Sequence, residues 1–171
     1  MIATALDWLV KDVRHTLREF RSPDKEGNLR EVTVHKQRLA KPAKLANAAG
    51  EVGLVPYALV KYLYFKIQGG RLFATFELVF GVNATEDELK EKGVDEILMQ
   101  DAVLTRFLEQ PELGPPDERE ESTRPTLGPI RFVEEGANGA NLIENTSPYG
   151  AGGLLLTFEL PKIQTRGWGY A

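Results

Sequence analysis

The stretch that decides the fold is YALVKYLYFKI at 57–67, followed by QGG at 68–70 and RLFATFELVFGV at 71–82. Both long runs are rich in aromatic and β-branched residues, which favour extended backbone. The Gly69-Gly70 pair between them is typical of the tight turn that joins two antiparallel strands. The sequence therefore predicts a long β-hairpin at the centre of a sheet.

Both faces of this hairpin carry apolar side chains. Strict alternation puts Leu59, Leu63, Phe65 and Ile67 on one face, which we expect to meet the helices. The other face then carries Val60, Tyr62 and Tyr64 and needs a cover of its own. Either a second helix layer of the same chain or another subunit can supply that cover.

Outward from the hairpin, the chain predicts two helices and three more strands. Apolar residues at helical spacing predict a first helix that ends near Arg21; they are Ile2, Leu6, Leu9, Val13, Leu17 and Phe20. A second helix is expected at about 94–109, with a buried stripe of Val94, Ile97, Leu98, Leu104 and Leu108. Strands are expected at 31–35, 130–133 and 154–160. These elements predict an α+β fold in a single domain, 1–171, with a mainly antiparallel sheet of about four to five strands and two main helices.

The remaining segments are predicted to be loops. Residues 36–55 form a long basic loop, either a contact arm or an ordinary connection. Residues 112–129 are rich in proline and charge and indicate a solvated loop, and 136–141 indicates another. In the C-terminal tail, 162–171, the aromatics follow no period, so they anchor the tail either on a neighbouring surface or on the same domain.

Composition argues against most catalytic chemistry. The chain has no cysteine, which excludes disulfides, thiolate zinc sites and cysteine nucleophiles. Its two histidines, His15 and His35, lie in settings that favour a solvated surface role over catalysis. No glycine-rich phosphate-binding motif follows a strand, and the acids of 86–101 have no EF-hand spacing. We therefore expect a soluble protein that is not an enzyme, has no cofactor, does not enter membranes and does not read nucleic-acid sequence, with a metal-dependent hydrolase as the distant alternative.

Charge is divided unevenly along the chain. Residues 1–71 hold 13 Lys and Arg against 7 Asp and Glu, whereas residues 72–171 hold 8 against 18. The two parts thus carry about +6 and −10. Such a division suits head-to-tail contacts between copies, although it is equally consistent with an accident of surface composition.

Three short motifs and the order of elements resemble the tail terminator, or tail completion, proteins of long-tailed bacteriophages. The motifs are FELVFGV at 76–82 running into Asp87, then Gly93-Val94-Asp95 before a helix, and finally Pro148-Tyr149-Gly150 ahead of the strand that ends at Pro161. The resemblance implies a twisted mixed sheet flanked by helices and a homohexameric ring at the head-proximal end of the tail. Such a ring ends tail-tube polymerisation and joins the tail to the head.

The resemblance also implies where the protein works and what it meets. It would be a virion protein of the tail or neck, assembled in the host cytoplasm, with the tail tube protein, the head–tail connector and the tape measure protein as partners, while DNA passes through the ring. Another neck or tail component, such as a head completion protein or a tube subunit, is the alternative. The expected interface residues are Lys36, Arg38, Lys41, Lys44, Gly69, Gly70, Arg71, Glu118, Glu120, Glu121, Trp168 and Tyr170.

Overall fold

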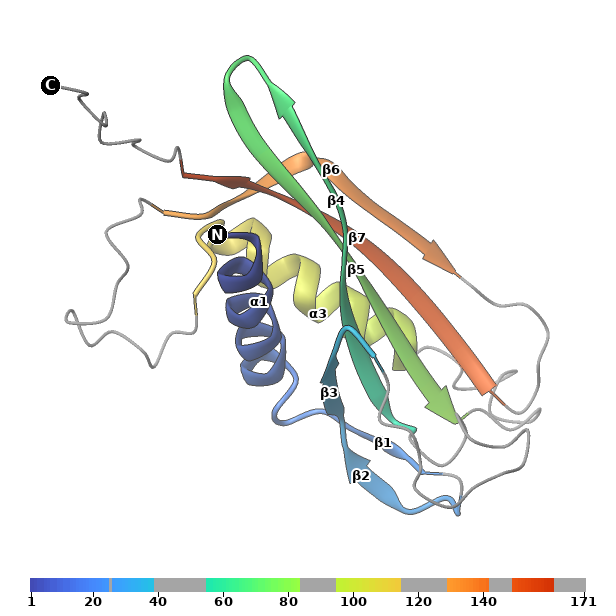
Figure 1. The fold of residues 1–171 in the computed structure, drawn as a ribbon. Coiled ribbons are helices and arrows are strands. Elements are labelled where there is room, and N and C mark those ends of the chain that lie inside the picture. Colours follow the sequence, from blue (N-terminus) through green and yellow to red (C-terminus); the bar gives the residue numbers. More distant parts are fainter. Residues whose placement is uncertain (25, 39–54, 84–94, 115–128, 142–148, 162–171) are drawn as a thin grey trace, which may run out of the picture.

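The computed structural model describes the chain apart from residues 25, 39–54, 84–94, 115–128, 142–148 and 162–171 (Figure 1). The described residues form an α+β fold, as the sequence predicts. Its elements in chain order are α1 (Ile2–Thr16), β1 (Arg21–Pro23), β2 (Leu29–Glu31), β3 (Thr33–Lys36), β4 (Tyr57–Gln68), β5 (Arg71–Asn83), α3 (Asp95–Glu109), β6 (Arg131–Asn141) and β7 (Tyr149–Leu160).

The main sheet has five strands in the order β3-β4-β5-β7-β6. The pairs β4–β5, β5–β7 and β7–β6 are antiparallel, and only β3 joins in parallel, to β4. The sheet is therefore mixed and mainly antiparallel. Strands β1 and β2 form a separate small hairpin. Both helices lie on the same side of the main sheet (Figure 1).

The predicted hairpin is confirmed, with β4 and β5 joined by a two-residue turn. Gly69 and Gly70 have φ angles of 58° and 73°, a left-handed pair that only glycine adopts without strain and that matches the twist of the strands. The strands pair from Gln68↔Arg71 down to Tyr57↔Gly81. The glycine pair thus fixes both the turn and the register of the two longest strands.

The predicted faces of the hairpin are wrong, because a β-bulge interrupts the alternation. Tyr62 pairs with Phe76 but Tyr64 pairs with Thr75, so Leu63 is an extra residue in β4. Beyond such a bulge the side chains change faces. The helix side of β4 carries Ala58, Val60 and Tyr62, which pack in or against the core, and then Phe65 and Ile67, which are exposed. Leu59 and Tyr64 share the outer face, which is the face turned away from α1 and α3.

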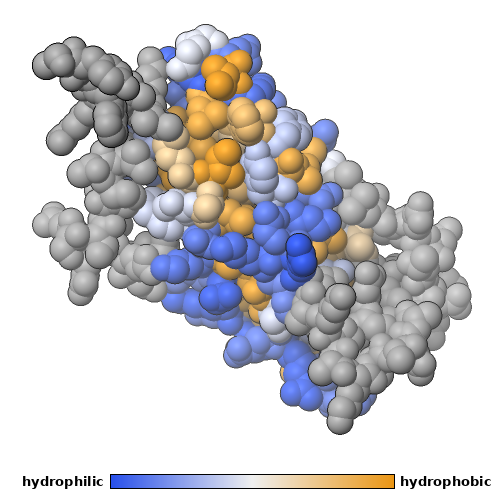
Figure 2. Space-filling model, viewed as in Figure 1, coloured by the Kyte–Doolittle hydropathy of each residue, from blue (hydrophilic) through white to orange (hydrophobic). Residues whose placement is uncertain are grey.

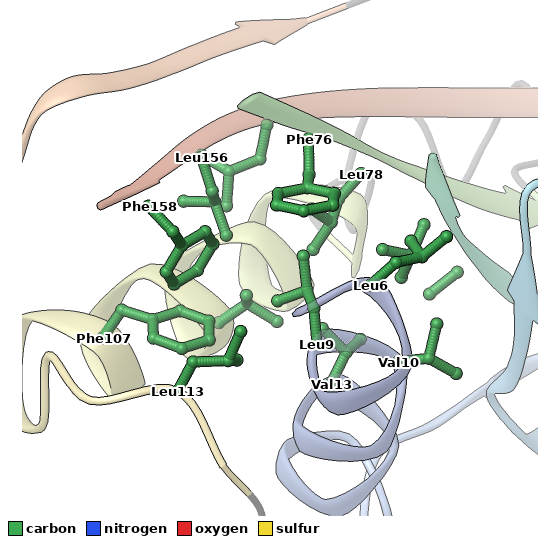
Figure 3. Close-up of a cluster of buried hydrophobic side chains, with 14 of the residues drawn as sticks. Leu6, Leu9, Val10, Val13, Phe76, Leu78, Phe107, Leu113, Leu156 and Phe158 are labelled. Atoms are coloured by element: carbon green, nitrogen blue, oxygen red, sulfur yellow. The ribbon is translucent and has the colours of Figure 1, made fainter. Parts of the chain in front are cut away.

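One hydrophobic core lies between the helices and this face of the sheet (Figure 3). Helix α1 contributes the predicted stripe, with Leu6, Leu9 and Val13 buried. At the other end, the ring of Phe158 on β7 lies 5.2 Å from that of Phe107 on α3, with their planes close to perpendicular. Edge-to-face aromatic pairs of this kind add to the stabilisation that burial provides.

The predicted stripe of the second helix is wrong. Its buried apolar residues are Met99, Val103 and Phe107, while Ile97, Leu98 and Leu108 are exposed. Of the other predicted members, Leu104 is partly buried against the core, and Val94 lies outside the described residues. The helix holds apolar residues on more than one side, so spacing alone allows two stripes about a third of a turn apart. Helix α3 turns the stripe that contains Phe107 towards the sheet, because the ring of Phe107 packs against the rings of Phe132 and Phe158.

Several predicted boundaries also change. The first helix, expected to end near Arg21, ends at Thr16, and Arg21 already begins β1. The strand expected at 31–35 is divided between β2 and β3, and β6 and β7 extend over 131–141 and 149–160. The predicted loop at 136–141 is therefore part of a strand. The predicted loop at 112–129 begins inside the fold, since Leu113 is buried and its N–H donates to the carbonyl of Ile130. An apolar residue beside prolines and charges thus anchors a segment that composition alone marks as solvated.

Within the described ranges, no helix is both long enough and apolar enough to cross a membrane.

Candidate assembly surface

The distal half of the β4–β5 hairpin holds four of the eight large hydrophobic residues that are exposed among the described residues. Leu63, Tyr64, Phe65 and Ile67 are 41%, 53%, 53% and 70% exposed. Figure 2 shows apolar surface gathered at the hairpin end of the molecule, above a broad hydrophilic region. Phe65 and Ile67 lie on the helix side of β4 and Tyr64 on its outer face, so these exposed apolar side chains surround the edge of the strand from both sides. We call the stretch Leu63–Gln68 the distal edge.

The distal edge is open because β3 is short. Strand β3 pairs with β4 only as far as Val60, and Gln37 then turns away with a φ of 62°. The Gln37 N–H donates to the carbonyl of Val60, and its side-chain Oε1 accepts from the N–H of Tyr62 at 3.0 Å. Beyond Tyr62, no other described residue pairs with the edge of β4 that faces away from β5. The backbone there presents unpaired donors and acceptors, which is what an added strand requires.

Basic residues flank this edge. Lys61 pairs with Glu77 on β5 at 3.1 Å, and Arg71 pairs with Glu159 on β7 at 3.4 Å. Lys66 lies 5.5 Å from the ring centre of Phe73 and has no carboxylate partner among the described residues. Its ammonium group is therefore the charge on the distal edge that is left for another molecule.

The opposite edge of the sheet is β6, and it is acidic. Its first residues are covered, because Phe132 donates its N–H to the carbonyl of Pro111 and Arg131 lies near Glu112 at 3.6 Å. From Val133 to Asn138 the pairing with β7 is interrupted by a bulge that contains Glu134 and Glu135. Both glutamates are exposed, and neither has a cationic partner in the part of the chain that the structure describes. The two open edges of the sheet thus differ in charge.

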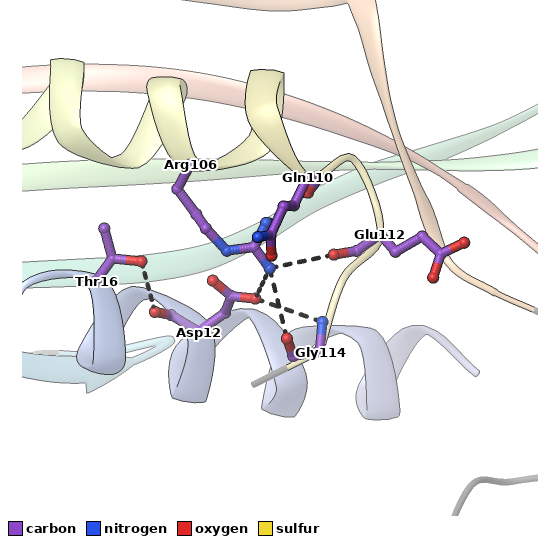
Figure 4. A network of polar contacts seen from close by, with 6 residues as sticks. All are labelled: Asp12, Thr16, Arg106, Gln110, Glu112 and Gly114. Carbon is purple, nitrogen blue, oxygen red and sulfur yellow. Dashed lines mark hydrogen bonds and ion pairs between the residues drawn. The ribbon is translucent and has the colours of Figure 1, made fainter. Parts of the chain in front are cut away.

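A buried ion pair holds the helices together beneath this sheet (Figure 4). Asp12 of α1 accepts from Arg106 of α3 at 2.7 Å, with side chains that are 1% and 15% exposed. Arg106 also donates to the carbonyls of Gln110, Glu112 and Gly114. It therefore fixes the end of α3 and the following turn onto α1. Burial raises the pKa of Asp12 above its ordinary value, while Arg106 acts against that rise.

A second buried carboxyl lies at the start of α3. Glu96 is fully buried, and neither of its side-chain oxygens has a hydrogen-bond partner among the described residues. Burial, with a smaller effect from the charge of Asp95, raises the pKa of Glu96. No group of three or more potential metal ligands occurs within the described ranges, so the acids at 95–101 by themselves assemble no metal centre.

The two histidines occupy different settings. His15 lies on α1 at 3.5 Å from Arg18. His35, which the sequence places at the surface, is partly buried beside Tyr57, at 6.4 Å between ring centres. Burial lowers the pKa of His35, which favours the neutral ring.

The predicted interface residues that the structure describes lie around β3 and the hairpin tip. Lys36 ends β3 and pairs with Asp7 of α1, and Arg38 follows it at the surface. Gly69, Gly70 and Arg71 form the exposed turn. The remaining predicted interface residues lie outside the described residues: Lys41, Lys44, Glu118, Glu120, Glu121, Trp168 and Tyr170.

The division of charge along the sequence does not produce two separate charged surfaces in this sheet. Strand β4 comes from the basic part and β5 from the acidic part, and Lys61 and Glu77 neutralise each other across them. Arg71 and Glu159 do the same between β5 and β7 at the tip of the hairpin. The contrast that remains between the edges rests on Lys66 on one side and Glu134 and Glu135 on the other.

Sequence reasoning missed the residues that open the edges. The bulge at Leu63 has no local signal, although the aromatic run on both sides of it shows that alternation cannot bury every apolar residue. Glu134-Glu135 before Gly136 indicates a break in a strand, because like charges and glycine weaken regular pairing. Asp12 was detectable as a charged residue next to the apolar stripe of α1.

Comparison with protein-family models gives no match, and no curated protein matches the chain.

Proposed function

We propose that this protein is a non-catalytic structural protein that assembles with copies of itself, and that the assembly is the ring at the head-proximal end of a phage tail. One observation carries the proposal: the distal edge combines four exposed apolar side chains with a strand that pairs with β5 on one side and with no described residue on the other. Such an edge promotes association unless another chain covers it. The resemblance of the sequence motifs to tail terminators supports the choice of a ring over other assemblies.

The role follows from the geometry of closed rings. A ring of identical subunits needs two different complementary patches on each subunit. The distal edge is one such patch, and a different surface of the subunit must supply the other. In the proposed role the ring covers the end of the tail tube, ends its polymerisation and offers its other face to the head connector.

The test compares two lysine substitutions of matched exposure. Ile67 on the distal edge is 70% exposed and Leu29 on β2 is 69% exposed, so neither substitution removes core packing. Native mass spectrometry of the wild type should show one closed oligomer, Ile67→Lys should shift it to monomer, and Leu29→Lys should leave it intact. Circular dichroism checks that both variants fold.

The cellular role needs its own measurement. Negative-stain microscopy of the protein mixed with tail tubes of a matching phage should show one ring at the head-proximal end of each tube. Binding along the whole tube would indicate a tube subunit instead, and no binding to tubes by a protein that forms rings would place it elsewhere in the neck.

A further inference from the structure

We propose that neighbouring copies join when the distal edge of one copy packs against the outer face of α3 in the next. This inference rests on the proposed function and names the second patch that a ring needs. The outer face of α3 is the side turned away from the sheet, and its exposed residues are Ile97, Leu98, Asp101, Thr105 and Leu108. The occupant of the distal edge is therefore a second copy of this chain.

The two patches hold nearly all of the large apolar side chains that the described residues expose. Four of the eight lie on the distal edge, and three more lie on α3, where Ile97, Leu98 and Leu108 are 42%, 48% and 51% exposed. The eighth is Leu29 on β2. Removal of apolar surface from water is the main driving force of association. One contact between the two patches covers seven of these eight side chains at once.

Helix geometry places a charge in the middle of the α3 patch. With about 3.6 residues per turn, positions four and seven apart share a face, so Ile97, Asp101 and Leu108 lie along one side of α3. The buried Val103 turns to the opposite side, into the core. Ile97 and Leu108 are about 16 Å apart along the helix axis, and Leu63–Ile67 spans about 13 Å of strand. The two patches therefore match in length.

The unpaired charges of the two patches are opposite. Lys66 lies among the apolar residues of the distal edge and has no carboxylate partner within the described ranges. Asp101 lies among those of α3, is exposed, and has no cationic partner in the part of the chain that the structure describes. The only basic residue of α3 is Arg106, which is bound to Asp12. Opposite charges across an interface fix its register and exclude wrong partners.

Charge also disfavours the two symmetric alternatives. Contact between two distal edges about a twofold axis brings Lys66 of one copy towards Lys66 of the other, and contact between two α3 faces does the same with Asp101. Both juxtapose like charges, which is costly. A contact between two different patches closes into a ring when the rotation allows it.

The position of the hairpin suits this contact. Figure 1 shows the end of the β4–β5 hairpin projecting beyond both helices, so the distal edge stands clear of the core of its own subunit. A helix laid along an open strand is one of the ways in which proteins protect such an edge. In the proposed contact, α3 of the next copy provides that protection.

The first experiment is a charge exchange followed by sedimentation velocity. Lys66→Glu and Asp101→Lys should each raise the protein concentration needed for assembly about tenfold, and the chain that carries both should regain assembly. Glu134→Lys, an equally exposed charge reversal on β6, is the control and should assemble as the wild type does. Thermal denaturation of each variant below the assembly concentration shows that the fold is retained.

A second substitution tests the apolar part of the α3 patch. Leu108→Lys should shift the oligomer to monomer as Ile67→Lys does, whereas Leu29→Lys should not, because Leu29 belongs to neither patch. Full assembly of Leu108→Lys at wild-type concentration would overturn the proposal.

Cross-linking identifies which surfaces meet, since the chain has no cysteine of its own. A mixture of Lys66→Cys chains and Asp101→Cys chains should give covalent dimers with a bis-maleimide, and neither variant alone should do so. Dimers of either variant alone would overturn the proposal in favour of a twofold contact.

The outcomes separate this contact from the proposed function. If the wild type assembles but the charge reversals leave assembly unchanged, or the doubly exchanged chain stays weak, contact with α3 is refuted and the ring stands. If the wild type never assembles, the proposed function itself fails and the contact fails with it.

Discussion

Removal of Arg106 gives the sharpest test of how the scaffold is held together. In Arg106→Met, the stem of the side chain is retained while the carboxylate of Asp12, which is 1% exposed, loses its cation. The remaining donor is the N–H of Gly114 at 3.4 Å, and Asp12 Oδ1 has no partner among the described residues. Breaking a buried pair by removing one partner costs about 3–5 kcal/mol. That is a large part of the total of about 5–15 kcal/mol expected for a domain.

Urea unfolding monitored by tryptophan fluorescence measures this loss, with Arg131→Met as the matched control. Arg131 also pairs with a carboxylate, Glu112 at 3.6 Å, but both side chains are more than 60% exposed. Exposed pairs contribute about 0–1 kcal/mol, so the control should lie close to the wild type. A second substitution, Asp12→Asn, should return much of the stability that Arg106→Met removes, because the uncompensated charge is then absent.

The pH dependence of the stability of Arg106→Met tests whether the uncompensated charge of Asp12 causes the loss. A carboxyl whose pKa is higher in the folded than in the unfolded protein stabilises the fold most below its unfolded value, here 3.8, and stability falls as pH rises through the folded value. Without Arg106 the pKa of Asp12 rises further, so the deficit of Arg106→Met should shrink between neutral pH and pH 4. A deficit below about 1 kcal/mol, or one that does not change with pH, would refute the reasoning.

Three further predictions concern closely packed positions. Glu96→Gln should raise stability at pH 7 by about 1–3 kcal/mol, because burial raises the pKa of Glu96 and the wild type loses stability as pH rises above 4.5; unfolding curves from pH 4 to 8 should be flatter for the variant, and an unchanged slope would contradict this. Gly136→Ala should destabilise the fold, since its Cβ would lie 2.5 Å from the Cβ of Thr157; a melting temperature equal to that of the wild type would show that the bulge moves freely. Phe107→Ala should cost about 3–5 kcal/mol in urea unfolding, because the ring is fully buried against two other phenylalanines, and a loss under 1 kcal/mol would contradict this packing.

Local patterns predicted the elements of this fold well where the chain has one strong signal. The apolar spacing of α1 and the Gly69-Gly70 turn each allow a single local solution, and both elements are confirmed, although α1 ends at Thr16 and not near Arg21. Patterns failed where two solutions differ only in tertiary packing. The stripe of α3 is decided by the aromatic residues it meets on β6 and β7, and no local rule reports those contacts.

The candidate surface was only partly predictable, because its exposed residues also depend on contacts that local patterns do not report. An excess of apolar residues on the hairpin indicated that some would lack cover, but it identified most of them wrongly. Val60 and Tyr62, expected on the open face, pack in or against the core, whereas Leu63, Phe65 and Ile67, expected against the helices, are exposed. Which residues are exposed depends on the single extra residue Leu63, since one inserted residue exchanges the faces of everything beyond it. The open edge depends on where β3 stops, and Gln37 ends it through a side-chain hydrogen bond that the sequence does not announce.

The central claim is that this chain closes into an oligomer of defined size through the distal edge. Sedimentation velocity of the wild type over a wide range of concentration tests it most directly. The account predicts one assembled species whose sedimentation coefficient stops increasing once it has formed, and its loss in Ile67→Lys. A monomer at every concentration, or a species that Ile67→Lys leaves unchanged, would contradict it.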